Sequence, residues 1–278
     1  MKIRVISSLV AGAMLIGALI VSQFFPEMLH VVVSLISAVA AYEVVGATGA
    51  RKSRSVTIAS IAAAAIFPFT MLAANAGLAA KTLVCVYALF VFAMELRKHK
   101  DIPMPNMMVT VLLTLLVPAS LSHIVTLRLM GGAAHGMFLL IMMLLAAWSS
   151  DTGAYFAGVK LGKHKLCPVI SPKKTVEGFI GGILSCILIL EIVAFVYGWL
   201  ISPDAELYYI AIAVTAAVCS VISVLGDLTF SLLKRHVGIK DYGSIMPGHG
   251  GVLDRFDSVI FVAPVFTLII TYFPILHV

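Results

Sequence analysis

The chain has 278 residues, of which 61% are hydrophobic and only 12% are charged, and its mean hydropathy is +1.09. Soluble globular domains are roughly half apolar and about one quarter charged, so this composition excludes that class. The formal net charge of +6 comes mostly from short basic connectors. It therefore indicates membrane topology and a basic face towards anionic headgroups or phosphates, and we expect no nucleic-acid partner.

Nine apolar stretches approach the ~20 residues that cross a ~30 Å hydrocarbon core. A backbone in lipid must satisfy its own hydrogen bonds, so these stretches predict about nine transmembrane helices and an all-α polytopic membrane protein. The predicted spans are residues 5–25, 28–48, 56–74, 78–95, 107–127, 135–159, 177–200, 207–230 and 257–276. The span 135–159 has the weakest pattern, because Asp151, Gly153 and Gly158 interrupt it.

Basic residues predict the orientation of these spans. With the N-terminus in the cytoplasm, 17 of the 19 Lys and Arg residues fall in cytoplasmic segments, and only Lys81 and Arg128 fall outside them. The first span follows Lys2 and Arg4 as a signal peptide would. Its apolar run is too long for one and no A-x-A-like cleavage site follows, so we expect a retained helix.

Polarity is distributed unevenly along the chain. Residues 1–130 resemble ordinary apolar helices, in which only Glu43 is a charged residue well placed for function. We predict that this part is a scaffold with dimer or lipid contacts. Residues 131–278 hold three polar segments, 149–158, 171–178 and 226–257, which the predicted topology brings to the cytoplasmic side. We predict that this second part carries the site.

Paired aspartates mark the start of the last span. Asp254 and Asp257 are spaced i, i+3, so both carboxylates share one helix face if this segment opens the helix. They could cap a helix N-terminus. A pair beside Arg255 is better explained as ligands of a hard divalent cation such as Mg²⁺. Asp227, at the end of the preceding span, is a third candidate ligand; the alternative is an ion pair with Lys234.

The segment before that helix is rich in glycine, with Gly248, Gly250 and Gly251 within five residues. Such a segment can turn successive N–H groups towards an anion, and a helix start immediately after it favours a phosphate site. The alternative is a plain turn. The neighbouring charges of Lys240, His249 and Arg255 favour phosphate binding.

Two further segments carry polar residues towards the same side. Asp151 lies among Ser149, Ser150 and Thr152, which indicates either a hydrogen-bond cluster between helices or a contact to a polar substrate group. The segment 171–178, SPKKTVEG, is predicted to open a helix. Two lysines there oppose the helix dipole, so phosphate binding explains them better than anchoring by positive charge. Glu177 is predicted either to cap this helix or to pair with a lysine.

These residues indicate metal-assisted phosphoryl or nucleotidyl transfer at a membrane surface. The run SLLKRHVGIKDYGSIMPGHGGVLDRFD, residues 231–257, resembles the signature of the phosphatidate cytidylyltransferases, also called CDP-diglyceride synthases. The one departure is Met246, where the family usually has Leu, Ile or Phe, and this exchange conserves volume. SSDTGAYFAG and SPKKTVEG are also similar to family motifs, so the resemblance covers residues 149–257 well.

The resemblance implies that CTP and phosphatidic acid give CDP-diacylglycerol and pyrophosphate, with Mg²⁺ as cofactor and K⁺ as a candidate second cation. It implies a homodimer in the bacterial cytoplasmic (inner) membrane, with its site facing the cytoplasm. The predicted metal ligands are Asp227, Asp254 and Asp257. The predicted catalytic group is Asp227, Lys234, His249, Asp254, Arg255 and Asp257. The predicted substrate-binding residues are Asp151, Ser171, Lys173, Lys174, Thr175, Glu177, Ser231, Arg235, Lys240, Asp241, Gly250 and Gly251.

Two other classes of function fit part of the pattern. A transporter could use Asp151, Glu191 and Asp227 as an ion relay, but the polar residues gather at one membrane face and do not follow a path. A related lipid enzyme, such as a CTP-dependent polyprenol kinase or a CDP-alcohol phosphotransferase, is the second alternative. The motif D-G-x2-A-R-x8-G-x3-D-x3-D, typical of the phosphotransferases, is absent from the sequence.

Overall fold

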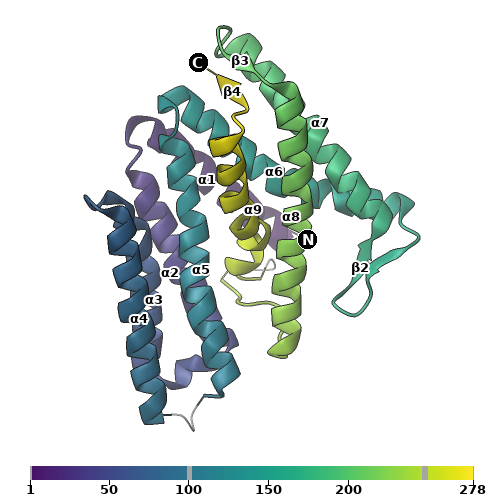
Figure 1. Cartoon of the computed structure of the whole chain (residues 1–278). Helices are drawn as coiled ribbons and strands as arrows, with labels where there is room; N and C mark the ends of the chain where they lie inside the picture. Colours follow the sequence, from purple (N-terminus) through teal and green to yellow (C-terminus); the bar gives the residue numbers. More distant parts are fainter. Residues whose placement is uncertain (1, 99–101, 246–249, 278) are drawn as a thin grey trace. The chain divides into compact units, whose positions relative to one another are not determined.

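The structure is a computed structural model that describes residues 2–98, 102–245 and 250–277. Within these residues the chain forms nine α-helices (Figure 1). They are α1 (Lys2–Phe24), α2 (Met28–Ala47), α3 (Arg54–Ile66), α4 (Ala76–Lys98), α5 (Met104–Leu129), α6 (Gly132–Leu161), α7 (Val176–Leu200), α8 (Tyr209–His236) and α9 (Leu253–Tyr272). Two short 3₁₀ helices, η1 (Ala50–Lys52) and η2 (Phe67–Leu72), flank α3. Each predicted span overlaps one of the nine helices, with η2 completing the span that α3 begins, and the all-α prediction is confirmed.

By length and composition, seven of the helices in the described part of the chain can cross a membrane. They comprise α2, α3 continued by η2, α4, α5, α6, α7 and α8. The chain is therefore an integral membrane protein of the polytopic helical class. Two boundaries matter for the site. α8 continues six residues beyond the predicted end of its span, and α9 begins four residues earlier than predicted, so Lys234 and Asp254 both lie on helices.

The chain divides into two compact units. One comprises Met1–Val125 and Lys234–Phe256, and the other comprises Thr126–Leu233 and Asp257–Val278. The predicted division near residue 130 concerned function, and it stays a prediction. The chain passes from one unit to the other within α5, α8 and α9, so most of the predicted motif 231–257 belongs to the first unit.

In the first unit, α2 packs against α3, and α3 packs against α4 (Figure 1). Their core is aliphatic, around Val45, Val56 and Val91. Hydroxyl groups bridge helices inside this core. The Thr48 and Thr110 hydroxyls lie 2.7 Å apart. Such bonds satisfy polar groups where water is absent.

In the second unit, α6 and α7 pack closely along small residues. A Cβ atom at Gly153 would collide with Ser185, and one at Gly181 would collide with Ala157. Small residues let membrane helices approach in this way. The glycines that weakened the predicted span 135–159 therefore serve helix packing, and α6 is continuous through them.

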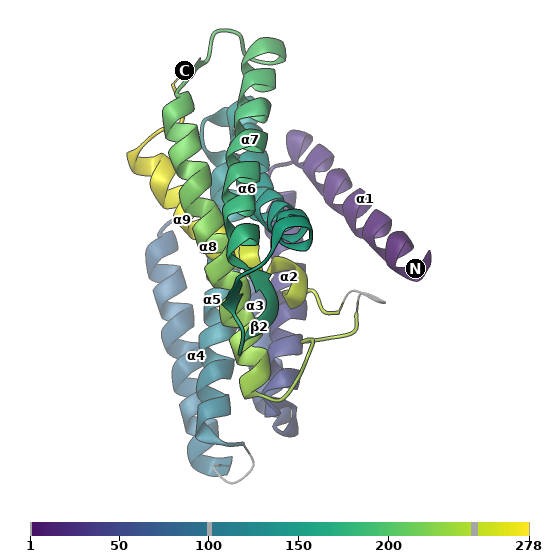
Figure 2. The same ribbon diagram turned by 90° about the vertical axis from the view of Figure 1, so that its right-hand side faces the viewer.

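Two short two-stranded sheets complete the second unit. β1 (Lys165–Cys167) pairs antiparallel with β2 (Ser171–Thr175) in the connection between α6 and α7 (Figure 2). β3 (Glu206–Leu207) pairs with β4 (Leu276–His277). Neither sheet was predicted. Strands β1, β3 and β4 are too short for an alternating pattern, and β2 has the sequence SPKKT, which contains no apolar alternation.

Candidate functional site

The end of α8 is fixed by its own backbone. Gly238 has φ +72°, and its N–H donates to Arg235 O, while the N–H of Ile239 donates to Lys234 O. This is the Schellman pattern, in which glycine supplies the left-handed residue. It sets where the helix stops, and so where the last turn presents Lys234 and Arg235.

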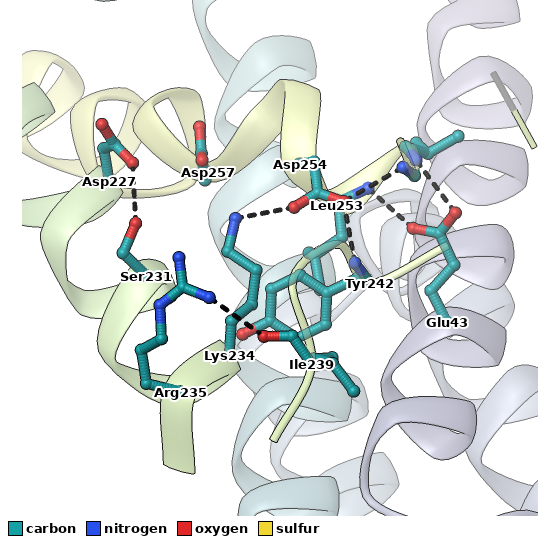
Figure 3. A network of polar contacts seen from close by, with 12 residues as sticks. Glu43, Asp227, Ser231, Lys234, Arg235, Ile239, Tyr242, Leu253, Asp254 and Asp257 are labelled. Carbon is teal, nitrogen blue, oxygen red and sulfur yellow. Dashed lines mark hydrogen bonds and ion pairs between the residues drawn. The ribbon is translucent and has the colours of Figure 1, made fainter. Parts of the chain in front are cut away.

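Asp254, in the first turn of α9, is a buried carboxylate with three donors. Lys234 Nζ lies 2.7 Å from one oxygen. The other oxygen accepts the backbone N–H groups of Tyr242 at 2.8 Å and Gly251 at 3.0 Å (Figure 3). Only 3% of the Asp254 side chain is exposed. Asp254 therefore ties the end of α8, the segment after it and the start of α9 together.

Glu43, on α2, accepts the next two backbone N–H groups of that segment. Val252 N lies 2.9 Å from one carboxylate oxygen and Leu253 N lies 2.8 Å from the other. The backbone N–H groups of Gly251, Val252 and Leu253 are thus all bound by carboxylates of the protein itself. The predicted phosphate site at Gly250 and Gly251 stays a prediction. Its central residues, Pro247 to His249, lie outside the described residues.

Asp227, on α8 in the second unit, has two polar neighbours. The Ser231 hydroxyl donates to one carboxylate oxygen at 3.2 Å (Figure 3). Lys174 Nζ lies 2.7 Å from the other oxygen and forms an ion pair with it. The angles at this contact are not those of a hydrogen bond. The expected alternative, a pair between Asp227 and Lys234, is wrong, since each of these residues pairs elsewhere. Asp227 keeps 30% of its side chain exposed, so a ligand can still reach it.

The two predicted phosphate lysines lie on strand β2 and not at a helix N-terminus, since α7 begins only at Val176. Successive side chains on a strand point to opposite faces. Lys174 accordingly turns to Asp227, while Lys173 is exposed. Both lysines therefore precede the first turn of α7, and the dipole of that helix gives no reason to expect a phosphate beside them.

The start of α7 is capped by Thr175, whose hydroxyl accepts the N–H of Gly178 at 3.1 Å. Glu177 lies in the first turn of α7, where its carboxylate also interacts with its own backbone N–H. Among the described residues it forms its ion pair with His164 and with no lysine side chain, so the predicted lysine contact is wrong. Its carboxylate accepts the backbone N–H groups of Lys163 and His164, and it lies 2.6 Å from His164 Nδ1. Glu177 thus joins the helix start to the segment that precedes β1.

Asp151 accepts two hydroxyl groups from other helices of the second unit. Ser223, on α8, lies 3.1 Å from one oxygen and Ser258, on α9, lies 2.7 Å from the other. A Ser150–Ser220 contact at 2.7 Å lies alongside. The predicted hydrogen-bond cluster between helices is therefore confirmed. The contact of Asp151 with a substrate stays a prediction.

The chain matches the cytidylyltransferase family over residues 2–273. The chain belongs to this family. Among curated proteins it is similar to the phosphatidate cytidylyltransferases of Staphylococcus saprophyticus (44% identity over 137 residues), Bacillus subtilis (44% over 139) and Staphylococcus aureus (46% over 145). The alignment with the Staphylococcus saprophyticus protein covers 49% of this chain and 50% of that protein. The shares are 50% and 49% for the Bacillus subtilis protein, and 49% and 50% for the Staphylococcus aureus protein. The chain thus spans about half the length of the curated relatives it matches.

The remaining predicted residues of this cytidylyltransferase-family chain are mostly accessible. Asp257 is half-buried, and one of its oxygens accepts the N–H of Ser258 at 2.8 Å. Ser171 is half-buried on β2. The exposed residues of the set are Lys173, Arg235, Lys240, Asp241 and Arg255.

The oxygen donors of the second unit fit a hard cation. Mg²⁺ is commonly held by one or two carboxylates together with water and substrate phosphates. Among the residues that the structure describes, no three His, Cys, Asp or Glu side chains are grouped as a metal site. Asp227 has a partly exposed carboxylate, and the Ser231 hydroxyl lies beside it. These oxygen atoms are the kind of ligand that such a cation takes, and solvent can reach the carboxylate.

Sequence reasoning missed three residues that organise these groups, and it singled out a fourth, Glu43, without its partner. Ser223 and Ser258 look like ordinary small residues of membrane helices, and His164 lies in a basic connector without a motif. Glu43 did carry a signal, because it is a lone acidic residue in an apolar helix and such residues need a partner. The sequence could not reveal that its partner is a backbone segment more than 200 residues away.

Proposed function

We propose that this chain transfers a cytidylyl group from CTP to phosphatidic acid, giving CDP-diacylglycerol and pyrophosphate. The observation that carries the proposal is the family match over residues 2–273, joined to relatives named phosphatidate cytidylyltransferase. Polar groups in each unit support it: the Lys234–Asp254 pair in the first unit, and the Asp227 carboxylate with the Ser231 hydroxyl in the second. The rest of the chain consists mostly of long apolar helices.

The proposed reaction is one displacement at phosphorus. A phosphatidate oxygen attacks the α-phosphorus of CTP and forms a new P–O bond. The bond from that phosphorus to the oxygen bridging the α- and β-phosphates breaks, and pyrophosphate leaves with its electron pair. Such a transfer asks the protein for position and charge neutralisation more than for covalent chemistry.

We assign the cation ligands to Asp227, Asp254 and Asp257, for Mg²⁺ with K⁺ as a candidate second cation. Bound Mg²⁺ would neutralise charge on the CTP phosphates. The exposure of Asp227 supports its direct part in this. Asp254 already accepts hydrogen bonds from three donors, which hold the start of α9. In the proposal it coordinates the cation in addition to these bonds.

The exposed cations Lys173, Arg235, Lys240 and Arg255 suit the phosphate groups of CTP and phosphatidate, together with His249. Lys174 and Lys234 differ from them because each pairs with an aspartate. In the proposal they set the position of these aspartates and supply positive charge beside the phosphates.

The basic connectors support a site at the cytoplasmic face of a bacterial inner membrane, because Lys and Arg accumulate on that side. A homodimer is part of the proposal and rests on the family resemblance alone. A cysteine-accessibility experiment with a substitution in the β1–β2 hairpin would test the orientation, since labelling from the cytoplasmic side only is expected.

The activity test uses the purified full chain in liposomes containing phosphatidic acid, supplied with CTP, with and without Mg²⁺. CDP-diacylglycerol and pyrophosphate in equal amounts, formed only with Mg²⁺, are expected. Asp204→Asn, an exposed carboxylate beyond the C-terminal end of α7, is the matched control for changes at Asp227. Release of CDP in place of pyrophosphate would favour a lipid kinase, and no turnover of any lipid by folded protein would refute the proposal.

A further inference from the structure

Glu43 is a buried acidic residue in the half of the chain that the sequence marks as scaffold. It lies on α2, four residues before that helix ends at Ala47, and only 1% of it is exposed. Both of its carboxylate oxygens accept backbone N–H groups, from Val252 and Leu253, at 2.9 and 2.8 Å (Figure 3). This geometry suits an ionised carboxylate, which accepts at both oxygens and donates at neither.

These two N–H groups belong to the start of α9. The first N–H groups of a helix have no partner within the helix, and a side-chain oxygen of the preceding residue commonly accepts one of them. The residue before α9 is Val252, whose side chain has no acceptor. Glu43 supplies the missing acceptors from a different helix, and its negative charge is favourable at the positive end of the helix dipole.

Glycines make room for this carboxylate. A Cβ atom at Gly243 or at Gly251 would collide with the carboxyl group of Glu43. Both glycines belong to the segment between α8 and α9. Because neither glycine has a side chain, the backbone at both positions packs directly against the carboxyl group of Glu43.

We propose that Glu43 is a positioning residue for cytidylyl transfer, which fixes the first turn of α9 and thereby the directions of Asp254, Arg255 and Asp257. This inference rests on the proposed function. A cap that served stability alone could sit at any helix start. This one sits at the helix start that carries three of the residues assigned to the cation and the phosphates.

The test variant is Glu43→Gln, which keeps the shape but replaces one acceptor by an N–H₂ donor facing a backbone N–H. Replacing a residue that orients the ligands of a metal, without itself binding the metal, typically lowers activity or metal affinity by about 10- to 100-fold. We expect a fall in kcat of about 10- to 100-fold and a rise in the Mg²⁺ concentration for half-maximal activity. The matched control is Glu95→Gln, another buried glutamate of the same unit, on α4, which should change neither.

Hydrogen exchange supplies a readout independent of turnover. Amides that lose their partner open more often, so a peptide covering residues 250–254 should exchange faster in Glu43→Gln than in the wild-type chain or Glu95→Gln. Wild-type exchange and an unchanged Mg²⁺ requirement in folded Glu43→Gln would overturn the inference. If the wild-type chain makes no CDP-diacylglycerol, the proposed function fails, while the exchange result still decides whether Glu43 holds the α9 start.

A second variant covers the case in which Glu43→Gln does not fold. Gly243→Ala pushes a methyl group against the carboxylate without removing its charge. It should raise the Mg²⁺ requirement and speed exchange at residues 250–254 in the same direction. A folded Gly243→Ala chain with wild-type values for both measurements would refute the positioning role.

Discussion

The carboxylates of Asp254 and Asp227 belong to the same polar stretch of sequence, yet their surroundings differ. Asp254 has 3% of its side chain exposed and is bound by an ammonium group and two backbone N–H groups. Asp227 has 30% exposed and is bound by an ammonium group and a hydroxyl. The first holds chain segments together, and the second stays open to solvent. Two aspartates of one polar segment therefore differ in kind: the Asp254 carboxylate fixes the backbone around it, and the Asp227 carboxylate is open to a ligand.

The largest effect is expected from breaking the Lys234–Asp254 pair. Removing one partner of a buried ion pair leaves an uncompensated charge and costs about 3–5 kcal/mol. Lys234→Met should lower the stability of the purified chain by this amount in thermal unfolding. The double variant Lys234→Met/Asp254→Leu should be more stable than Lys234→Met. A single variant as stable as the wild-type chain would show that the pair does not hold the structure.

Asp227→Asn should act on activity more than on stability, because this carboxylate is partly exposed. Removing one preorganised electrostatic contact typically lowers kcat by about 100- to 1000-fold. We expect such a loss of CDP-diacylglycerol formation, with a thermal unfolding midpoint close to that of Asp204→Asn. An equal loss of activity in Asp204→Asn, or full activity in Asp227→Asn, would contradict the assignment.

Thr175→Ala tests the cap of α7, next to the hairpin that carries Lys174. Loss of a side-chain N-cap typically costs about 1 kcal/mol. The thermal midpoint should fall slightly, and Thr175→Ser, which keeps the hydroxyl, should restore it. The prediction fails if the serine variant is as unstable as the alanine variant, because the hydroxyl would then not be the stabilising group.

Lys173→Ala is expected to have the smallest effect, because this lysine is exposed and contacts between exposed charges contribute about 1 kcal/mol or less. The KM for CTP should rise by a few-fold, with little change in kcat, and the rise should shrink at high salt. Lys174→Ala should instead lower kcat, since it removes the partner of Asp227. Identical kinetic changes in the two variants would contradict the prediction that Lys173 and Lys174, on opposite faces of β2, have different roles.

Much of the fold could be predicted from hydropathy. Spans of about 20 apolar residues and the bias of basic residues predicted nine helices, because the bilayer imposes length and internal hydrogen bonding on any chain that crosses it. The span 135–159 seemed weak because Gly153 and Gly158 resemble interruptions. In the structure Gly153 is a packing position against α7, and a single sequence does not distinguish a glycine that breaks a helix from one that lets two helices approach.

The site was predicted in part. Spacing along a helix correctly placed Asp254 and Asp257 on α9 and Ser231 one turn after Asp227, because these relations are local. The partners of the charged groups were not predictable in the same way. Lys174 and Asp227 are 53 positions apart, and Glu43 and Leu253 are 210 positions apart.

The sequence by itself thus determined the membrane class, the helices and the residue types from which the proposed site is built. Composition, periodicity and motif spacing are properties of short stretches, and they act before the chain is packed. Only the tertiary structure decided which acceptor satisfies which donor. A buried charge takes the partner that folding brings within about 3 Å, so Asp254 came to organise the start of α9 while Asp227 remained accessible.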